Sequence, residues 1–161
     1  MHTQPTALSA ESRPATLLPP PLIYFAGLLG AWALNQTASL VINFGRIGSV
    51  MGWVLVTFGV LGMAWALREI RVYRTTVNPY KAASALVTTG PFRFSRNPIY
   101  VSDWLIYAGL TFLLQTWWPW ILAPLVWALV RYSVIRHEEA HLHAKFGADY
   151  DAYCKTTRRW L

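Results

Sequence analysis

Two arginines beside an expected helix start are the first residues in this chain whose types indicate chemistry. Arg93 and Arg96 precede Asn97-Pro98, a pair typical of a helix N-cap followed by the first helical position, and Tyr100 lies one turn further on. Unpaired backbone N–H groups at a helix start and guanidinium groups both bind carboxylates or phosphates. The segment therefore predicts either an anion-binding site or a positive anchor beside a membrane helix, and the residues alone leave both open.

A second cluster of ionisable residues follows a long apolar run near the carboxyl end. Glu138 and Glu139 stand there in a chain with only 7 acidic residues, and Arg136 precedes them. Carboxylates at a membrane boundary need cationic partners, which Arg136 or the arginines of the first cluster could supply. The alternative is a solvated amphipathic helix that turns Leu142 and Tyr150 toward the bilayer or the helix bundle.

The same cluster contains a pattern that is typical of zinc sites. His137-Glu138-x-x-His141 would place two zinc ligands on one helical face beside a glutamate base. A catalytic zinc needs a third protein ligand, and no glutamate follows Glu139. The candidates that remain are His143, Asp149 and Asp151. We therefore predict no metal and keep a zinc hydrolase as the weaker alternative.

The composition places both clusters in a membrane protein. Of the 161 residues, 55% are hydrophobic and 13% are charged, whereas a soluble domain carries about 25% charged residues. No charged residue occurs between Arg46 and Arg68 or between Asp103 and Arg131, and such gaps are typical of transmembrane segments. The net charge of +7 then indicates basic cytoplasmic loops rather than nucleic-acid binding. The single cysteine excludes an intramolecular disulfide.

We predict an all-α integral membrane protein with about four transmembrane helices. A flexible cytoplasmic tail over residues 1–16 precedes a single membrane domain over residues 17–161. The expected spans are about 22–34, 47–67, 98–115 and 118–135. Residues 115–120, with Pro119 as the breaker, should turn the last two spans into a helical hairpin, and a cytoplasmic helix should follow. Glycines at positions 48, 52, 59 and 62 should permit close helix contact.

The basic residues predict the orientation of these spans. Twelve of the 14 Lys and Arg residues lie in residues 68–99 and 131–161, and basic segments favour the cytoplasmic side. Four spans with both termini in the cytoplasm satisfy this rule. An antiparallel hairpin then brings the two clusters of polar residues to the same face, although about forty residues separate them in the sequence.

The order and spacing of the two clusters resemble the isoprenylcysteine carboxyl methyltransferase and phospholipid methyltransferase superfamily. The resemblance is carried by Leu86-Val-Thr-Thr-Gly-Pro-Phe-Arg-Phe-Ser-Arg-Asn-Pro-Ile-Tyr100 and, after the hairpin, by Arg136-x-Glu-Glu-x-x-Leu-x-x-x-Phe-Gly-x-x-Tyr-x-x-Tyr153. It covers about residues 75–161. Members commonly have Arg-His-Pro where this chain has Arg96-Asn97-Pro98, so a role of the histidine ring does not transfer to Asn97.

The resemblance implies a pocket for S-adenosylmethionine, formed by residues 75–100 and 136–161, which an acceptor enters from the lipid side. The cofactor-binding residues implied in this chain are Gly90, Pro91, Arg93, Asn97, Pro98, Tyr100, Glu138, Glu139 and Tyr150. The implied catalytic residues are Arg96, Arg136 and Glu139. Arg136 or Arg96 would orient a carboxylate acceptor, whereas Glu139 would act as base toward an amine.

The residue types agree with the chemistry of this cofactor. S-adenosylmethionine carries a carboxylate, an ammonium, a sulfonium and an adenine, so its receptor needs cationic, acidic and aromatic side chains. We expect transfer of a methyl group to an apolar or lipid-like acceptor at a bacterial inner membrane, with no nucleic acid as partner. On this view, substitution of His141 should leave cofactor binding largely intact. The main alternative is an inactive membrane scaffold of the same fold.

Overall fold

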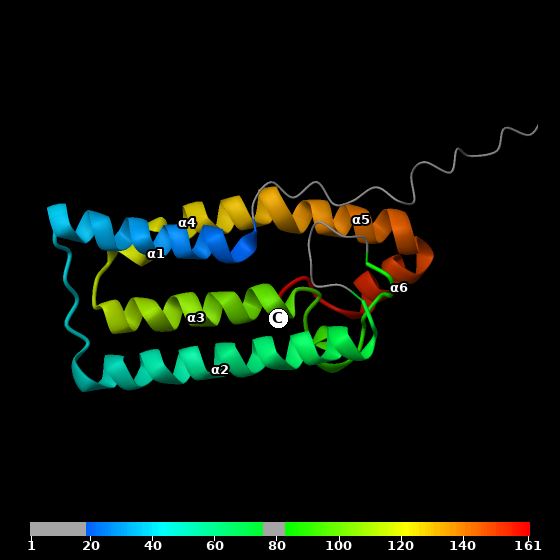
Figure 1. Cartoon of the computed structure of the whole chain (residues 1–161), viewed down its shortest axis with the longest axis horizontal. Coiled ribbons are helices and arrows are strands. Elements are labelled where there is room, and N and C mark those ends of the chain that lie inside the picture. Colours follow the sequence, from blue (N-terminus) through cyan, green and yellow to red (C-terminus); the bar gives the residue numbers. More distant parts are fainter. Residues whose placement is uncertain (1–18, 76–82) are drawn as a thin grey trace, which may run out of the picture.

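The computed structural model describes residues 19–75 and 83–161, and in this part of the chain the regular secondary structure is helical (Figure 1). The helices are α1 (Pro20–Thr37), α2 (Gly45–Val72), the 3-10 helix η1 (Gly90–Arg93), α3 (Pro98–Leu114), α4 (Trp118–Val130), the π-helix η2 (Arg131–Ile135), α5 (Arg136–Phe146) and α6 (Ala148–Thr156). The predicted tail over residues 1–16 lies outside the described residues, as do residues 76–82 of the basic loop.

The four predicted apolar runs all form helices. Two helices are long and apolar enough to cross a membrane: α2, and the continuous helix Trp118–Phe146, which is made of α4, η2 and α5. The shorter helix α3 is also apolar. Ile47, Trp53 and Phe58 of α2 are among many large apolar side chains that are exposed on the surface of the bundle. Such a surface is unfavourable in water and is explained by contact with lipid.

The bundle is built from two close helix pairs. Figure 1 shows α2 beside α3 and α1 beside α4. Glycines let α2 approach α3: a Cβ atom on Gly109 would lie 2.7 Å from the carbonyl oxygen of Gly52, and one on Gly59 would lie 2.8 Å from that of Ser102. The prediction that small residues of the second run serve helix packing is therefore confirmed at Gly52 and Gly59.

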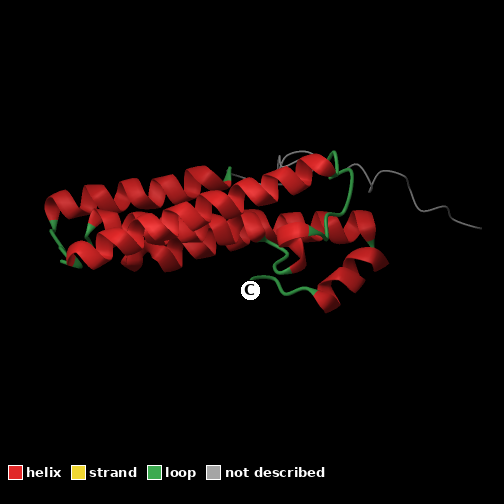
Figure 2. Ribbon diagram, turned by 90° about the horizontal axis from the view of Figure 1, so that it is seen from below, coloured by secondary structure: helices red, strands yellow, loops and turns green. Residues whose placement is uncertain are grey.

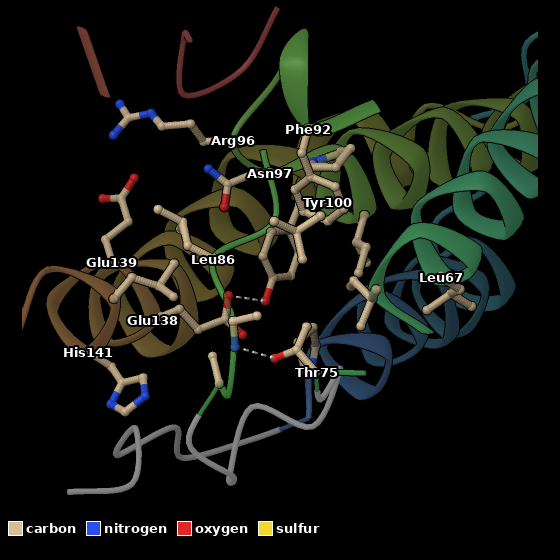
Figure 3. A pocket seen from close by; sticks show the side chains of 18 of the residues that line it. Leu67, Thr75, Leu86, Phe92, Arg96, Asn97, Tyr100, Glu138, Glu139 and His141 are labelled. Atoms are coloured by element: carbon tan, nitrogen blue, oxygen red, sulfur yellow. Dashed lines mark hydrogen bonds between the residues drawn. The ribbon is translucent and has the colours of Figure 1, made fainter. Parts of the chain in front are cut away.

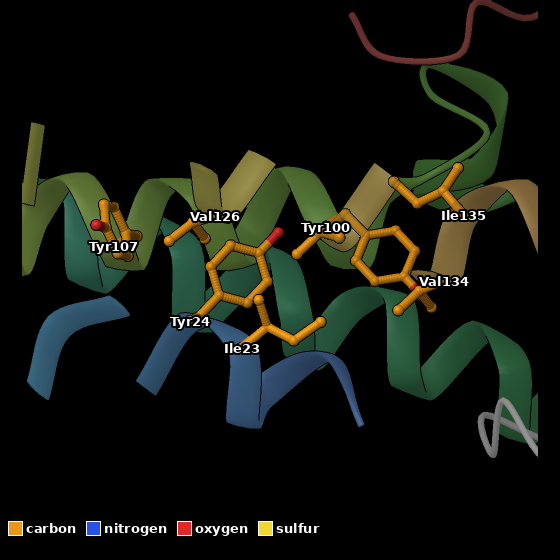
Figure 4. Packing of buried hydrophobic residues seen from close by; sticks show 8 residues of the cluster. Ile23, Tyr24, Tyr100, Tyr107, Val126, Val134 and Ile135 are labelled. Carbon is orange, nitrogen blue, oxygen red and sulfur yellow. The ribbon is translucent and has the colours of Figure 1, made fainter. Parts of the chain in front are cut away.

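A buried hydrophobic cluster that includes Tyr24, Tyr100 and Tyr107 joins the two pairs (Figure 4). Tyr107 of α3 donates a hydrogen bond to the carbonyl oxygen of Pro119 at 2.8 Å. Tyr24 of α1 packs edge-on against Trp104 with ring centroids 5.4 Å apart, and Val126 of α4 belongs to the same cluster. These contacts fix α1, α3 and α4 relative to one another.

The turn of the hairpin is shorter than predicted. Helix α3 ends at Leu114, and Gln115 adopts a left-handed conformation with φ 52°. The Thr116 hydroxyl donates a hydrogen bond to the Asn35 side chain at 2.9 Å. Pro119, predicted to break the chain, instead lies in the first turn of α4. Proline is tolerated there because its missing N–H would have no partner within the helix.

The carboxyl-terminal region also differs from the single helix that the sequence predicts. Gly147, with φ +49°, separates α5 from α6, and a positive φ is accessible to glycine at little cost. Figure 2 shows the long helices running together, with the short helices and several loops gathered at one end. That end carries both polar clusters.

Candidate functional site

The first cluster begins with a turn that packs on α2. Gly90 has φ +57°, and a Cβ atom there would lie 2.9 Å from the carboxyl carbon of Glu69. The Thr89 hydroxyl donates a hydrogen bond to the Glu69 carboxylate, and Pro91 is buried. Gly90 is therefore favoured by its left-handed conformation, which glycine adopts at little cost.

Ser95, Arg96 and Asn97 bind the carboxyl-terminal segment of the chain. The Asn97 amide nitrogen donates to the carbonyl oxygen of Arg159 at 3.0 Å, and the Ser95 hydroxyl donates to the same oxygen at 3.2 Å. The backbone N–H of Arg96 donates to the carbonyl oxygen of Arg158 at 2.9 Å. Asn97 occupies the predicted N-cap position of α3, but its side chain makes no cap hydrogen bond, and its amide nitrogen donates to Arg159 instead.

Side-chain contacts then join the first cluster to the second. The Tyr100 hydroxyl donates a hydrogen bond to Glu138 Oε2 at 2.9 Å, as Figure 3 shows. Arg159 binds the Glu139 carboxylate with two hydrogen bonds of 2.8 and 2.9 Å, a strong bidentate geometry. The structure therefore brings together the two clusters that the hairpin was predicted to unite.

A cavity of about 450 Å³ lies between the clusters (Figure 3). Its lining comes from the start of α1, the end of α2, residues 83–103, α5 and α6. The polar and aromatic lining residues are Thr75, Phe92, Arg96, Asn97, Tyr100, Asp103, Glu138, Glu139, His141, Tyr150 and Tyr153. Cavities of about 300 to 1,000 Å³ are typical of sites for small molecules and cofactors.

The lining of the cavity carries more carboxyl groups than guanidinium groups. Asp103, Glu138 and Glu139 contribute three carboxyl groups, of which Glu139 is already paired with Arg159, and Arg96 contributes one guanidinium. Tyr100 and other aromatic rings add faces that can accept a cation. The arrangement suits a ligand that carries both a cationic and an anionic group.

Three lining residues have buried polar atoms without a hydrogen-bond partner in the described part of the chain: Arg96 Nε, His141 Nε2 and Tyr150 Oη. Such atoms are costly unless something binds them, and a ligand is one way to satisfy them. Burial, reinforced by the nearby Glu139 carboxylate, raises the pKa of Tyr150. Its hydroxyl therefore stays protonated at neutral pH and can donate a hydrogen bond.

A second, more basic hollow adjoins the cavity, and we call it the basic cleft. It has a volume of about 600 Å³. It is lined by Arg96, Arg131, Tyr132, Ile135, Arg136, Glu139, Ala140, His143, Tyr150 and Arg159. Arg96, Glu139 and Tyr150 line both the cavity and the basic cleft, so these three residues lie where the two spaces meet.

The predicted site residues fall into three groups. Those that line the cavity are Arg96, Asn97, Pro98, Tyr100, Glu138, Glu139 and Tyr150. Arg136 lines the basic cleft only. Gly90, Pro91 and Arg93 line neither space. Arg93 is exposed, and its guanidinium carbon lies 5.7 Å from the centre of the Phe94 ring, so its role at the cofactor stays a prediction.

The structure adds residues that the sequence did not single out for this site. His141 is buried and lines the cavity, whereas the sequence pattern marks it only as a candidate zinc ligand. Arg159 holds Glu139 from beyond the end of α6. The one sequence feature that could have suggested a cationic partner for Glu139 is the pair of arginines at positions 158 and 159, which follows the second cluster. In residues 19–75 and 83–161, no group of three or more His, Cys, Asp or Glu side chains is placed to hold a metal ion.

Comparison with known proteins finds relatives that are named for resistance to metals. Over 156 residues, the chain is 28% identical to a nickel-cobalt-cadmium resistance protein of Alcaligenes xylosoxydans xylosoxydans, covering 93% of this chain and 72% of the relative. Over 133 residues, it is 29% identical to a cobalt-zinc-cadmium resistance protein of Cupriavidus metallidurans, covering 80% of this chain and 61% of that relative. No solved structure matches the chain significantly.

The family model for phospholipid methyltransferases matches residues 47–149. The match spans α2, the first cluster, the hairpin and α5, which include most of the residues around the cavity. This chain is a membrane protein that belongs to the phospholipid methyltransferase family.

Proposed function

We propose that the protein transfers a methyl group from S-adenosylmethionine to an apolar or lipid-like acceptor at the cytoplasmic membrane face. The observation that carries this proposal is the cavity between the two clusters, with its three carboxyl groups, one guanidinium and unpartnered buried polar atoms. The family supports a methyltransferase. The cavity volume of about 450 Å³ is in the range for a cofactor of this size.

The residues of the cavity fit the groups of the cofactor. Glu138, oriented by the Tyr100 hydroxyl, would face a cationic group. Arg96 has a buried, unpartnered Nε and would bind the carboxylate, while the Tyr150 hydroxyl would bind a further polar atom. The buried, unpartnered His141 Nε2 would also contact the cofactor, so this proposal replaces the sequence-based expectation that substitution of His141 leaves cofactor binding intact. When bound, S-adenosylmethionine supplies a methyl group that a nucleophile of the acceptor can attack.

The catalytic task of the chain is then to align the donor and the acceptor and to exclude water. Arg96 and Glu139 lie where the cavity meets the basic cleft, so we propose that they act at the reacting groups. Arg136 would act on the acceptor from the cleft. Arg159 holds the Glu139 carboxylate in a fixed position.

A transfer assay tests this function. Membranes that contain the full chain are incubated with S-adenosylmethionine labelled in its methyl group, and label is counted in the organic extract. We expect label to enter this fraction with the parent protein and not with Glu138→Gln. Equal labelling by the two proteins would contradict the assignment, and absence of labelling despite cofactor binding would favour the inactive scaffold.

We also propose four transmembrane helices, formed by α1, α2, α3 and residues 118–135 of the helix Trp118–Phe146, with residues 136–146 and both termini in the cytoplasm. The positions of twelve basic residues support this topology. Reporter fusions after Ala83 and after Leu161 should report a cytoplasmic location, whereas a fusion after Thr116 should report the opposite side. A cytoplasmic signal after Thr116, or an external signal at either other position, would contradict the model.

A role in metal resistance is a second candidate function, favoured by the names of both relatives. We propose that the methyl transfer, rather than a separate activity, would underlie such a role. If so, any nickel or cobalt tolerance that the chain confers should depend on Glu138.

A further inference from the structure

A patch of basic and aromatic side chains lies outside the cavity, where the first cluster packs on α2. Two contacts fix the η1 segment there: the Thr89 hydroxyl donates a hydrogen bond to Glu69, and the Phe94 ring packs against the ring of Trp65 with centroids 6.4 Å apart. Trp65 and Glu69 both belong to the carboxyl-terminal part of α2. Two segments that are distant in the sequence therefore form one surface.

This surface carries two guanidinium groups. Arg68 lies three residues after Trp65 and therefore shares its helical face. The Arg93 guanidinium carbon lies 5.7 Å from the centre of the Phe94 ring, a cation–π contact that positions the group without neutralising its charge. Both arginines are exposed, and neither forms an ion pair within the described residues. The surface is therefore suited to an anion.

The patch continues the apolar outer surface of α2. Phe58, Leu61 and Trp65 follow one another at spacings of three and four residues, so they share one helical face with Arg68. Phe58 and Leu61 are exposed, with relative accessibilities of 63% and 60%, and Phe94 is exposed at 58%. An apolar stripe thus ends at two aromatic rings and two guanidinium groups. This order is typical of a membrane boundary, where rings lie at the interface and arginines extend to the headgroups.

We propose that Trp65, Arg68, Arg93 and Phe94 bind an acidic phospholipid that holds the first cluster at the membrane surface, and we call these four residues the interfacial anchor. The phosphate would bind the two guanidinium groups, and the acyl chains would lie along the apolar stripe of α2. None of the four residues lines the cavity or the basic cleft, so this lipid is distinct from the methyl acceptor. The inference uses the membrane placement of α2 but not the proposed methyl transfer.

The test uses the purified full chain in a neutral detergent. It is titrated by calorimetry with dihexanoyl phosphatidylglycerol, with dihexanoyl phosphatidylcholine and with inorganic phosphate. We expect saturable binding of the acidic lipid, about tenfold or more tighter than of either other compound, because the zwitterionic lipid lacks the net charge and phosphate lacks the acyl chains. Equal affinity for the zwitterionic lipid would overturn the proposal, and equal affinity for inorganic phosphate would overturn the lipid as the occupant.

Substitutions locate the lipid at the interfacial anchor. Arg68→Gln with Arg93→Gln should weaken binding of the acidic lipid about tenfold or more, since each arginine beside an anionic headgroup contributes about fivefold. Arg158→Gln is the matched control, because Arg158 is also exposed but follows α6 and does not belong to the anchor. If the double variant fails to fold, Arg93→Gln alone should weaken binding about fivefold. Unchanged affinity in a folded single or double variant would overturn the proposal.

Binding of S-adenosylmethionine to the same samples separates this inference from the proposed function. The interfacial anchor lies outside the cavity, so the double variant should bind the cofactor as the parent does. A variant that lost cofactor affinity but kept its affinity for the acidic lipid would overturn the anchor and support the role of Arg93 at the cofactor that the resemblance implies. A parent protein that binds the acidic lipid through Arg68 and Arg93 but does not bind S-adenosylmethionine would support the anchor and overturn the proposed function.

Discussion

Glu138→Gln should weaken binding of S-adenosylmethionine about ten- to a hundredfold, because it removes the charge of a carboxylate that we place beside a cationic group of the cofactor. Glutamine keeps a side-chain oxygen that can accept the hydrogen bond that Tyr100 now donates to Glu138 at 2.9 Å. The variant should therefore fold, and titration calorimetry in detergent can compare its affinity with that of the parent.

Asp151→Asn provides the control for this substitution. Asp151 carries the same charge, but it is exposed and pairs with His143 at 3.2 Å on the surface of α6. Exposed pairs contribute about 0 to 1 kcal/mol, so the affinity of this variant for the cofactor should stay within about threefold of the parent. Equal affinities of the parent and Glu138→Gln would show that Glu138 does not bind the cofactor's cation.

Gly109→Ala is the second substitution from which we expect a large effect, here on stability. The new Cβ atom would lie 2.7 Å from the carbonyl oxygen of Gly52 and 2.9 Å from the backbone nitrogen of Val56, both on α2. Backbone atoms cannot rotate away as a side chain can, so α2 and α3 must separate. Overpacking of this kind typically costs about 1 to 3 kcal/mol, which denaturation in mixed detergent micelles can measure.

Gly30→Ala is a matched control in another helix. A Cβ atom on Gly30 would come no closer than 3.7 Å to Leu122, which is an ordinary contact. Because alanine favours helix over glycine by about 1 kcal/mol, this variant should be as stable as the parent or more stable. If Gly109→Ala proved equally stable, the close packing of α2 on α3 would be wrong.

Local sequence signals predicted the parts of the fold that depend on a few neighbouring residues. The uncharged runs located the helices, and Asn97-Pro98 marked the start of α3 because proline fits the first turn of a helix. The same signal misled at Pro119, where proline opens α4 instead of breaking the chain. A proline restricts the backbone but does not say on which side of it the helix lies.

Contacts between distant segments were harder to predict. The hairpin implied that the two clusters meet, and the Tyr100 to Glu138 hydrogen bond is such a contact. The arginine pair at positions 158 and 159 did not indicate that Arg159 would bind Glu139, because that contact requires Gly147 to reverse the chain and the carboxyl-terminal segment to return to the first cluster. His141 shared the face of Glu138 in sequence, yet its burial in the cavity depends on the packing of α5 against other elements.

Equilibrium binding of labelled S-adenosylmethionine to the purified full chain tests the central claim most directly. The protein is held in neutral-lipid nanodiscs, and free and bound cofactor are separated at increasing concentrations. We predict saturable binding at one site per chain, displaced by S-adenosylhomocysteine and weakened by Glu138→Gln. A folded protein that shows no saturable binding would contradict the assignment of the cavity as a methyl-donor site.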